Sequence, residues 1–202
     1  AFDPGDPHVI LAAGNLGLYR STDGGSNWTA VLNSECTAVA NKPGDPATWY
    51  TIQIDPALHY GRFYKSTDHG LTWSLRANGW YAPPAGEAGD YDVNVGRLAV
   101  TAADDDRIYA VLAGYQQAGA SVTTNGWVGT WVSTDGGESW SLPHGLIGTP
   151  YTDAHPNLMN FTGDDGTYTQ IGYNTTIIAS QIDPDRVLIG GLNLWRSDDG
   201  CA

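Results

Sequence analysis

Carboxylates and aromatic rings gather in three stretches of the sequence, and two kinds of chemistry would use them. Cleaving a glycosidic bond needs two carboxyl groups beside that bond, one of them kept protonated by its surroundings. Binding a sugar needs exposed aromatic planes that stack on its C–H faces, with acids that accept bonds from its hydroxyls. Aromatics that only pack long loops down are the competing interpretation. The candidate catalytic acids are Asp90, Asp92, Asp153, Asp164 and Asp165, and the candidate ligand-binding aromatics are Trp80, Tyr81, Tyr91, Tyr115, Trp127, Tyr151 and Tyr168.

The elements that must position these side chains are built around a repeated pattern, Ser-x-Asp-x-Gly-x-x-Trp. It occurs in full at residues 21–28, 66–73 and 133–140, and a fourth copy starts at 197 with Cys201 in place of the glycine. The Ser and Asp side chains can bond to the backbone of their own turn, the Gly supplies a positive φ, and the Trp buries a ring. Each copy therefore predicts a β-hairpin. The structural positions are Ser21, Asp23, Gly25, Trp28, Ser66, Asp68, Gly70, Trp73, Ser133, Asp135, Gly137, Trp140, Ser197 and Asp199.

A second repeated feature, a turn rich in Asp and often Pro, precedes every copy of the pattern. Together the two features predict units of four strands, A to D, with the Asp-rich turn between A and B and the eight-residue pattern between C and D. The units span about 1–33, 34–77, 78–143 and 144–202, and the first and last lack a strand. The predicted fold is all-β: a single domain, 1–202, that is a β-propeller or a propeller segment of about four four-stranded antiparallel blades.

This topology places every long insertion at one end of the blades. The A–B turns and the C–D hairpins share one end, so the B–C and D–A connections share the other. The insertions at residues 76–96, 113–129 and 143–172 are all of the second kind. Because loops on a rigid scaffold commonly carry function, we expect the candidate acids and aromatics to share this face.

The eight-residue pattern resembles the Asp-box, or BNR, repeat of sialidases, sortilin-type receptors, xyloglucanase-type glycoside hydrolases and secreted bacterial propellers. The resemblance implies that the boxes are structural and lie away from any active site, and it favours an extracellular location. Sialidase activity is disfavoured, because that resemblance would require three arginines on a substrate carboxylate and no Arg-Ile-Pro-like opening is present. No match to the catalytic segments of the glycan-chain hydrolases is found either.

Three functions remain open on the sequence. The first is a non-catalytic module that binds carbohydrate or a glycosylated protein, or that has a structural role. The second is a glycoside hydrolase that uses paired acids on the insertion face. The third is a self-assembling surface or filament subunit, in which further copies of the chain complete the terminal blades by strand exchange.

Composition excludes other partners. The formal net charge is −13, with 22 acidic residues against nine Lys and Arg, so nucleic acid and anionic membranes would be repelled. No apolar run is long enough to predict a membrane span. No cofactor is predicted and no histidine shows metal-ligand spacing, although the acidic turns could hold Ca²⁺ through their carboxylates.

Two further features concern covalent chemistry. Cys36 and Cys201 are the only cysteines, and the sequence leaves open whether they form a disulfide or remain two thiols. Three Asn-x-Ser/Thr sequences offer glycosylation candidates, at Asn27, Asn160 and Asn174. Asn27 lies inside the first box, so glycosylation there would interfere with the predicted hairpin.

Overall fold

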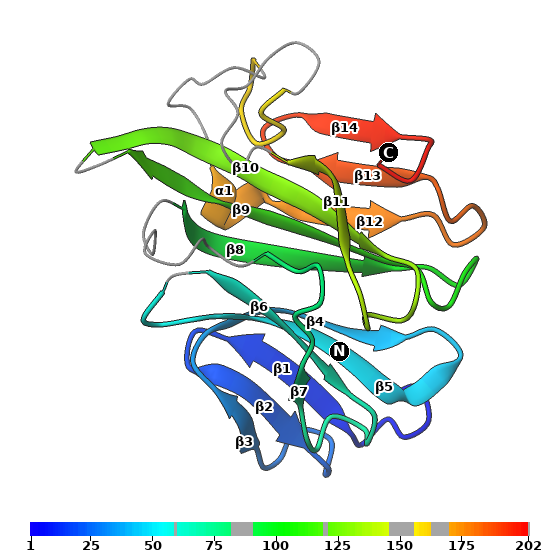
Figure 1. The fold of residues 1–202 in the computed structure, drawn as a ribbon. Coiled ribbons are helices and arrows are strands. Elements are labelled where there is room, and N and C mark those ends of the chain that lie inside the picture. Colours follow the sequence, from blue (N-terminus) through cyan, green and yellow to red (C-terminus); the bar gives the residue numbers. More distant parts are fainter. Residues whose placement is uncertain (59, 82–90, 119–120, 146–155, 163–169, 202) are drawn as a thin grey trace.

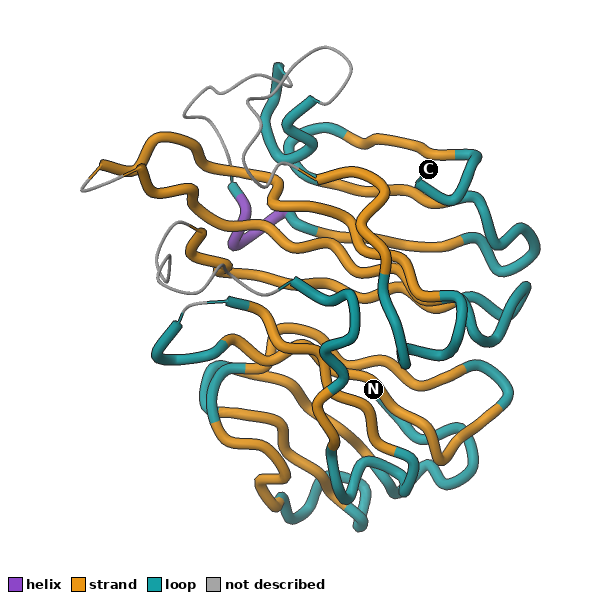
Figure 2. Tube along the Cα trace, in the orientation of Figure 1, coloured by secondary structure: helices purple, strands orange, loops and turns teal. Residues whose placement is uncertain are grey.

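The computed structural model describes residues 1–58, 60–81, 91–118, 121–145, 156–162 and 170–201, without the side chains of 91, 92, 115–118 and 121–125. These residues form four antiparallel sheets that follow one another in chain order (Figure 1). Strand dominates throughout (Figure 2), and the one described helix, α1 (Ile171–Asn174), is a single turn. No described helix is long and apolar enough to cross a membrane. The all-β prediction is confirmed.

Each sheet is one blade and follows one predicted unit. Blades 2 and 3 have four strands, whereas blades 1 and 4 have three. The strands are β1 (Ile10–Gly14), β2 (Gly17–Ser21) and β3 (Thr29–Asn33) in blade 1; β4 (Cys36–Lys42), β5 (Asp45–Ile54), β6 (Gly61–Ser66) and β7 (Ser74–Leu75) in blade 2; β8 (Tyr91–Val100), β9 (Ile108–Ala118), β10 (Ser121–Ser133) and β11 (Ser141–Gly145) in blade 3; and β12 (Thr176–Ala179), β13 (Val187–Gly190) and β14 (Leu194–Ser197) in blade 4.

The two three-stranded blades are incomplete in the way the repeats predict. Blade 1 keeps only the end of a strand A, where Phe2 bridges Ile10 and the amide of Asp3 donates to the carbonyl of Val9 at 2.9 Å. Blade 4 ends its order at β14, so it has no described strand D. The four blades stack side by side in an open arrangement, with blade 1 and blade 4 at opposite ends (Figure 1).

The hydrophobic core is divided among the three junctions between blades. Leu11, Leu18 and Trp49 are fully buried between blades 1 and 2. A larger, aromatic cluster fills the junction of blades 2 and 3, and a more aliphatic one fills the junction of blades 3 and 4. A single blade can bury its faces only against its neighbours, and the location of these clusters shows that dependence directly.

The four boxes share one set of hydrogen bonds. The serine hydroxyl donates to the Asp carboxylate at 2.6–2.8 Å and accepts the amide of the fifth box residue at 2.8–3.0 Å. In the three complete boxes the carboxylate also accepts both the amide and the side chain of the seventh residue, which is Asn27, Thr72 or Ser139. These bonds lower the pKa of Asp23 to about 2, led by the bond from the Asn27 side chain. The box aspartates are therefore used inside their own turns.

Each box is also fastened to the A–B turn of its own blade. The amide of the fourth box residue donates to that turn in all four blades, over 2.7–3.0 Å. The donors are Gly24, His69, Gly136 and Gly200, and the acceptors are the carbonyls of His8, Ala47, Asp106 and Asp185. This contact joins the two repeated sequence features into one structural unit at one end of the blade.

The predicted insertion at residues 113–129 is not a loop. It is the outer part of β9 and β10, which remain paired from Ile108 and Ser133 out to Ala118 and Ser121. Likewise residues 91–96 are the first part of β8. Pairing satisfies the backbone donors and acceptors of these stretches, which a long loop would leave to water.

Both cysteines are buried free thiols in separate core clusters, so the disulfide alternative is wrong. Burial raises the pKa of each, from about 9 to about 11. At pH 8 we therefore expect each thiol of the native protein to react with Ellman's reagent at least about 100-fold more slowly than an ordinary thiol, because the thiolate is the reactive form. Unfolding in guanidinium without reductant should release both thiols, whereas a disulfide would release none.

Candidate ligand-binding cleft between the third and fourth blades

The predicted catalytic acids are not brought together in the described structure. Asp90, Asp153, Asp164 and Asp165 lie outside the described residues, as do Tyr151 and Tyr168. Asp92 and Tyr91 lie on β8 and Tyr115 lies on β9, with only their backbone described. The paired-carboxylate hypothesis on the insertion face therefore stays a prediction.

Trp80 and Tyr81 do not offer open ring faces to a ligand. They are only 6% and 4% exposed, and both rings pack in the core between blades 2 and 3. The Trp80 ring contacts that of Trp140 edge to face, with centroids 4.7 Å apart, and its Nε1 donates to the carbonyl of Gly61 at 2.7 Å. The expectation that they bind ligand is corrected, because burying these large rings against a neighbouring blade removes them from solvent.

The junction of blades 3 and 4 differs from the other two at two repeated positions. Three residues before each box Ser, blades 1 and 2 have Leu18 and Phe63, which are fully buried, whereas blade 3 has Thr130. At the fifth box position, where the complete boxes have glycine, the fourth box has Cys201 with φ 64°. The smaller residue at position 130 leaves room between blades 3 and 4, which the cysteine fills only in part.

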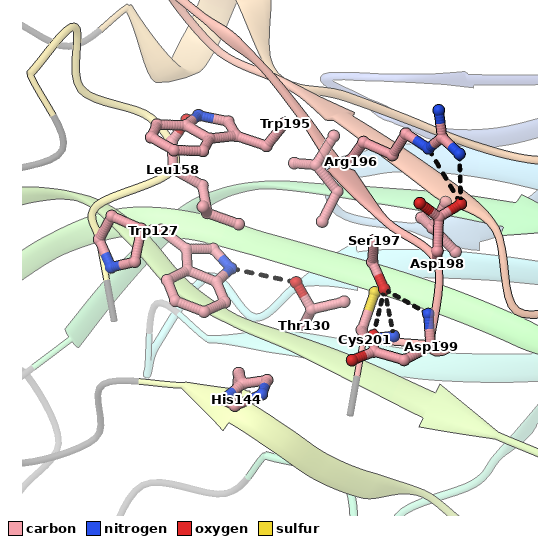
Figure 3. Close-up of a pocket in the computed structure, with 13 residues that line it drawn as sticks. Trp127, Thr130, His144, Leu158, Trp195, Arg196, Ser197, Asp198, Asp199 and Cys201 are labelled. Carbon is pink, nitrogen blue, oxygen red and sulfur yellow. Dashed lines mark hydrogen bonds and ion pairs between the residues drawn. The ribbon is translucent and has the colours of Figure 1, made fainter. Parts of the chain in front are cut away.

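That room is a cleft of about 300 Å³. Blade 3 contributes Trp127, Thr130 and His144, and blade 4 contributes Val187, Ile189 and Trp195 together with its box turn (Figure 3). Pro156 and Leu158 of the connection between the two blades complete the wall. Of the aromatics predicted to bind ligand, Trp127 is the one whose described side chain lines this cleft.

One end of the cleft is apolar. Trp127, Leu158 and Trp195 lie there together (Figure 3). The indole N–H of Trp195 donates to the carbonyl of Leu158 at 2.9 Å, and that of Trp127 donates to Thr130 Oγ1 at 3.1 Å. Trp127 is 4% exposed, so its ring belongs mainly to the core, whereas the half-buried Trp195, whose N–H is satisfied inside the protein, presents carbon surface to the cleft.

The other end is charged. Arg196 Nη2 lies 2.7 Å from Asp198 Oδ1, and Arg186 Nε lies 2.9 Å from the same oxygen. Hydrogen bonds from Arg196 and then from Arg186 lower the pKa of Asp198 below its usual value. The carboxylate is therefore ionised at neutral pH, so it can accept a bond from a ligand hydroxyl but is poorly suited to act as a general acid.

Metal binding gains no support from the part of the chain that the structure describes, where no group of three or more His, Cys, Asp or Glu could hold an ion. The acidic turns use their carboxylates internally. Asp3 accepts the amides of Gly5 and Asp6, and Asp45 accepts the amide of Ala47 and the hydroxyl of Thr48. Ca²⁺ in these turns stays a prediction.

The three glycosylation candidates lie in different settings. Asn27 Nδ2 donates to Asp23 Oδ2 at 2.7 Å inside the first box, and Asn160 is 1% exposed. A glycan on either side chain would disrupt the folded contacts. Asn174, in α1, is half-buried and donates to Gln170 Oε1 at 2.8 Å. Of the three, Asn174 is the site whose modification disturbs the described structure least.

Sequence reasoning missed Trp195, which is prominent in the cleft. It stands one residue before Arg196 in strand C, where a strand-forming aromatic needs no functional explanation. The signal that could have marked it is the loss of the large residue at Thr130 in the blade that faces it. That signal requires knowing which blades are neighbours and which way each residue points.

Comparison with known proteins supports the fold and the repeats. The BNR/Asp-box repeat family matches residues 64–75 and 131–142. Two similar solved structures are an ancestral GH74 enzyme (17% identity, TM-score 0.59, 97% of this chain and 25% of that one) and the GH74 xyloglucanase from Xanthomonas campestris (18% identity, TM-score 0.58, 99% and 27%). No curated protein sequence matches.

These findings define a protein of BNR/Asp-box repeats arranged as β-propeller blades. The chain spans about a quarter of the length of the two GH74 structures. Identities of 17% and 18% make the likeness one of fold.

Proposed function

We propose that this chain is part of an extracellular Asp-box propeller and binds a carbohydrate, free or on a glycosylated partner, without cleaving it. The observation that carries the proposal is the cleft of about 300 Å³ between blades 3 and 4, with the half-buried indole of Trp195 at one end and an ion pair at the other. A sugar ring has the same two-sided chemistry: its C–H face suits the Trp195 indole, and its hydroxyls suit Asp198 and Arg196.

The protonation state of Asp198 favours binding over hydrolysis at this cleft. Glycoside hydrolysis needs a carboxyl group that is protonated at the working pH. Asp198 is held ionised by two arginines, which lowers rather than raises its pKa. Asp198 can therefore orient a sugar but is not prepared to protonate a leaving group.

The proposal is tested by calorimetry with xyloglucan oligosaccharides, chosen because one of the similar structures is a xyloglucanase. Removing one wall of the cleft with Trp195→Ala should weaken binding by about tenfold or more, since the stacking contact and its buried area are both lost. Trp28→Ala is the matched control, because it removes an indole from blade 1, and it should leave affinity unchanged.

Two outcomes would contradict the proposal. The indoles of the second and third boxes pack against the preceding blade, which shows that a junction between blades can accept such a ring. If free indole binds the cleft and no oligosaccharide does, the cleft is a binding site for an indole side chain and not for a sugar. Release of shorter saccharides during the titration would overturn the non-catalytic assignment and favour the hydrolase alternative.

A further inference from the structure

The junction of blades 2 and 3 holds a carboxylate between two cations. Lys65, which immediately precedes the box of blade 2, donates from Nζ to the carbonyl of Gly136 and to Glu138 Oε1, both at 2.8 Å. Arg76, which follows β7, has its Nε 2.9 Å from Glu138 Oε2. Gly136 and Glu138 are the fourth and sixth residues of the box in blade 3. The bond from Lys65 is the largest of the effects that lower the pKa of Glu138, so this carboxylate is ionised.

The junction of blades 1 and 2 repeats the cation but not the carboxylate. Arg20 stands immediately before the box of blade 1, as Lys65 does in blade 2. Its Nε donates at 2.8 Å to the carbonyl of His69, the fourth box residue of blade 2. The sixth residue of that box is Leu71, where the box of blade 3 has Glu138. The following box therefore supplies Arg20 with a carbonyl and with no carboxylate.

The second cation is replaced as well. In each of the two blades the residue before the box pairs with the first residue of strand D. Two positions further along the chain, blade 1 has Val31 and blade 2 has Arg76. Two aliphatic side chains, Val31 and Leu71, thus stand at the first junction where the second junction has an ion pair.

A pocket of about 210 Å³ lies at this place. Arg20, Val31 and Leu71 line it together with Thr22 and Thr29, and every lining residue belongs to blade 1 or to the box of blade 2. The volume is below the roughly 300–1,000 Å³ of drug-sized binding sites. The pocket therefore suits one sugar ring or one side chain.

The guanidinium of Arg20 is available to a ligand in this pocket. Arg20 is half-buried, and among the described residues its only hydrogen bond is the one from Nε to His69. Asp23 also lines the pocket, but its carboxylate accepts bonds from Ser21 and Asn27 inside the first box. The planar fork of donors on a guanidinium matches a carboxylate in a bidentate manner.

We propose that this pocket binds the carboxylate of a uronic acid residue, in the place that Glu138 fills at the next junction. Arg20 donates to the carboxylate, a C–H face of the sugar ring lies on Val31 and Leu71, and the ring hydroxyls bond to the two threonines. A uronic acid is favoured over an acidic peptide side chain because the walls offer both aliphatic surface and hydroxyl groups. The site is separate from the cleft between blades 3 and 4, so it does not rest on carbohydrate binding there.

The charge of the protein restricts the ligand to isolated uronic acid residues. With a formal net charge of −13, the chain repels a polyuronate as it repels other polyanions. A single carboxylate experiences much less of this repulsion. In about 150 mM NaCl the Debye length is about 8 Å, so distant acids are screened while direct contact with Arg20 is retained.

The experiment is a calorimetric titration with sodium glucuronate in about 150 mM NaCl. Arg20→Gln should raise the dissociation constant at least about tenfold, because it removes a charge-assisted bidentate pair. Leu71→Glu keeps Arg20 and supplies a carboxylate from the box itself, as Glu138 does, so it should abolish binding. Leu16→Glu is the matched control and should bind as the wild type does. It adds the same charge outside the pocket, at a residue that is 79% exposed in the turn between β1 and β2.

Two further probes test what the pocket recognises. Glucose, which lacks the carboxylate, should bind at least about tenfold more weakly than glucuronate, and so should acetyl-glutamate amide, which lacks the ring. Equal binding of glucose would refute recognition of a carboxylate, and tighter binding of acetyl-glutamate amide would refute the uronic acid assignment.

The location of the site has its own decisive results. A wild type that shows no saturable binding of glucuronate up to about 50 mM overturns the proposal. So does a Leu71→Glu variant that binds glucuronate as tightly as the wild type. Circular dichroism should show that this variant is folded, because it retains Arg20 and the bond to His69 and changes a side chain that is 59% exposed.

Discussion

Replacing Gly137 with alanine is expected to lower the free energy of unfolding by about 3 kcal/mol, whereas Gly25→Ala should cost about 1 kcal/mol. The two glycines hold the same box position with similar backbone, at φ 83° and φ 93°. An added Cβ at Gly137 would lie 2.8 Å from the Phe63 ring, while at Gly25 the nearest atom is 3.6 Å away. Both substitutions place a Cβ on a left-handed backbone, but only the alanine at position 137 also clashes with the preceding blade.

Urea unfolding of the two variants followed by circular dichroism measures this difference. A double-mutant cycle with Phe63→Leu provides an internal check, because this substitution shortens the side chain that the added Cβ would meet. Phe63→Leu should lower the free energy of unfolding less in the Gly137→Ala background than in the wild type. The fourth box already shows the same compensation, since Cys201 stands at the fifth position opposite a blade that has Thr130 in place of Phe63. Equal losses for Gly137→Ala and Gly25→Ala would refute the steric account.

Trp140→Ala is expected to cost about 4 kcal/mol and Trp28→Ala about 1 kcal/mol. The Trp140 ring contacts both Phe63 and Trp80 edge to face, each with centroids 4.7 Å apart, and is 6% exposed. Trp28 occupies the same place in its box but is 43% exposed. The larger loss at Trp140 follows from the cavity that its removal opens between blades 2 and 3.

Loss of a hydrogen bond cannot explain a larger stability loss for Trp140→Ala, because only the Trp28 indole has a hydrogen bond to lose. The indole N–H of Trp28 donates to the carbonyl of Gly25 at 2.9 Å, whereas that of Trp140 is buried with no hydrogen-bond partner among the described residues. Thermal and urea denaturation of the two variants at a protein concentration too low for association provide the comparison. If Trp28→Ala and Trp140→Ala lower the free energy of unfolding equally, the indole stabilises its own box and not the contact with the neighbouring blade.

The local structure of the boxes could be predicted because it depends on short-range chemistry. Ser, Asp and Gly at fixed offsets bond to their own turn, and all four copies show the same serine contacts. The division of the chain into blades with incomplete ends followed from the spacing of these boxes and the Asp-rich turns. The outer β9–β10 hairpin was missed, because strands beyond the body of a blade carry no box to mark them.

The candidate site could be predicted only in small part, because a site depends on which side chains remain uncovered. Aromatic residues at Trp80 and Trp195 look alike in the sequence, yet one is 6% exposed in the core and the other lines a cleft. That difference arises from the residue on the facing blade, which is far away in the sequence.

The sequence by itself determined the all-β class, the hairpin at each box and the number of blades, because turn-forming residues act within a few positions of one another. Only the tertiary structure decided which faces are filled. Between blades 2 and 3, Phe63 and Trp140 close the junction, whereas between blades 3 and 4 the smaller Thr130 stands in place of Phe63 and lines a cleft. Packing between blades depends on pairs of side chains more than 60 residues apart, and no local pattern encodes how two such residues meet.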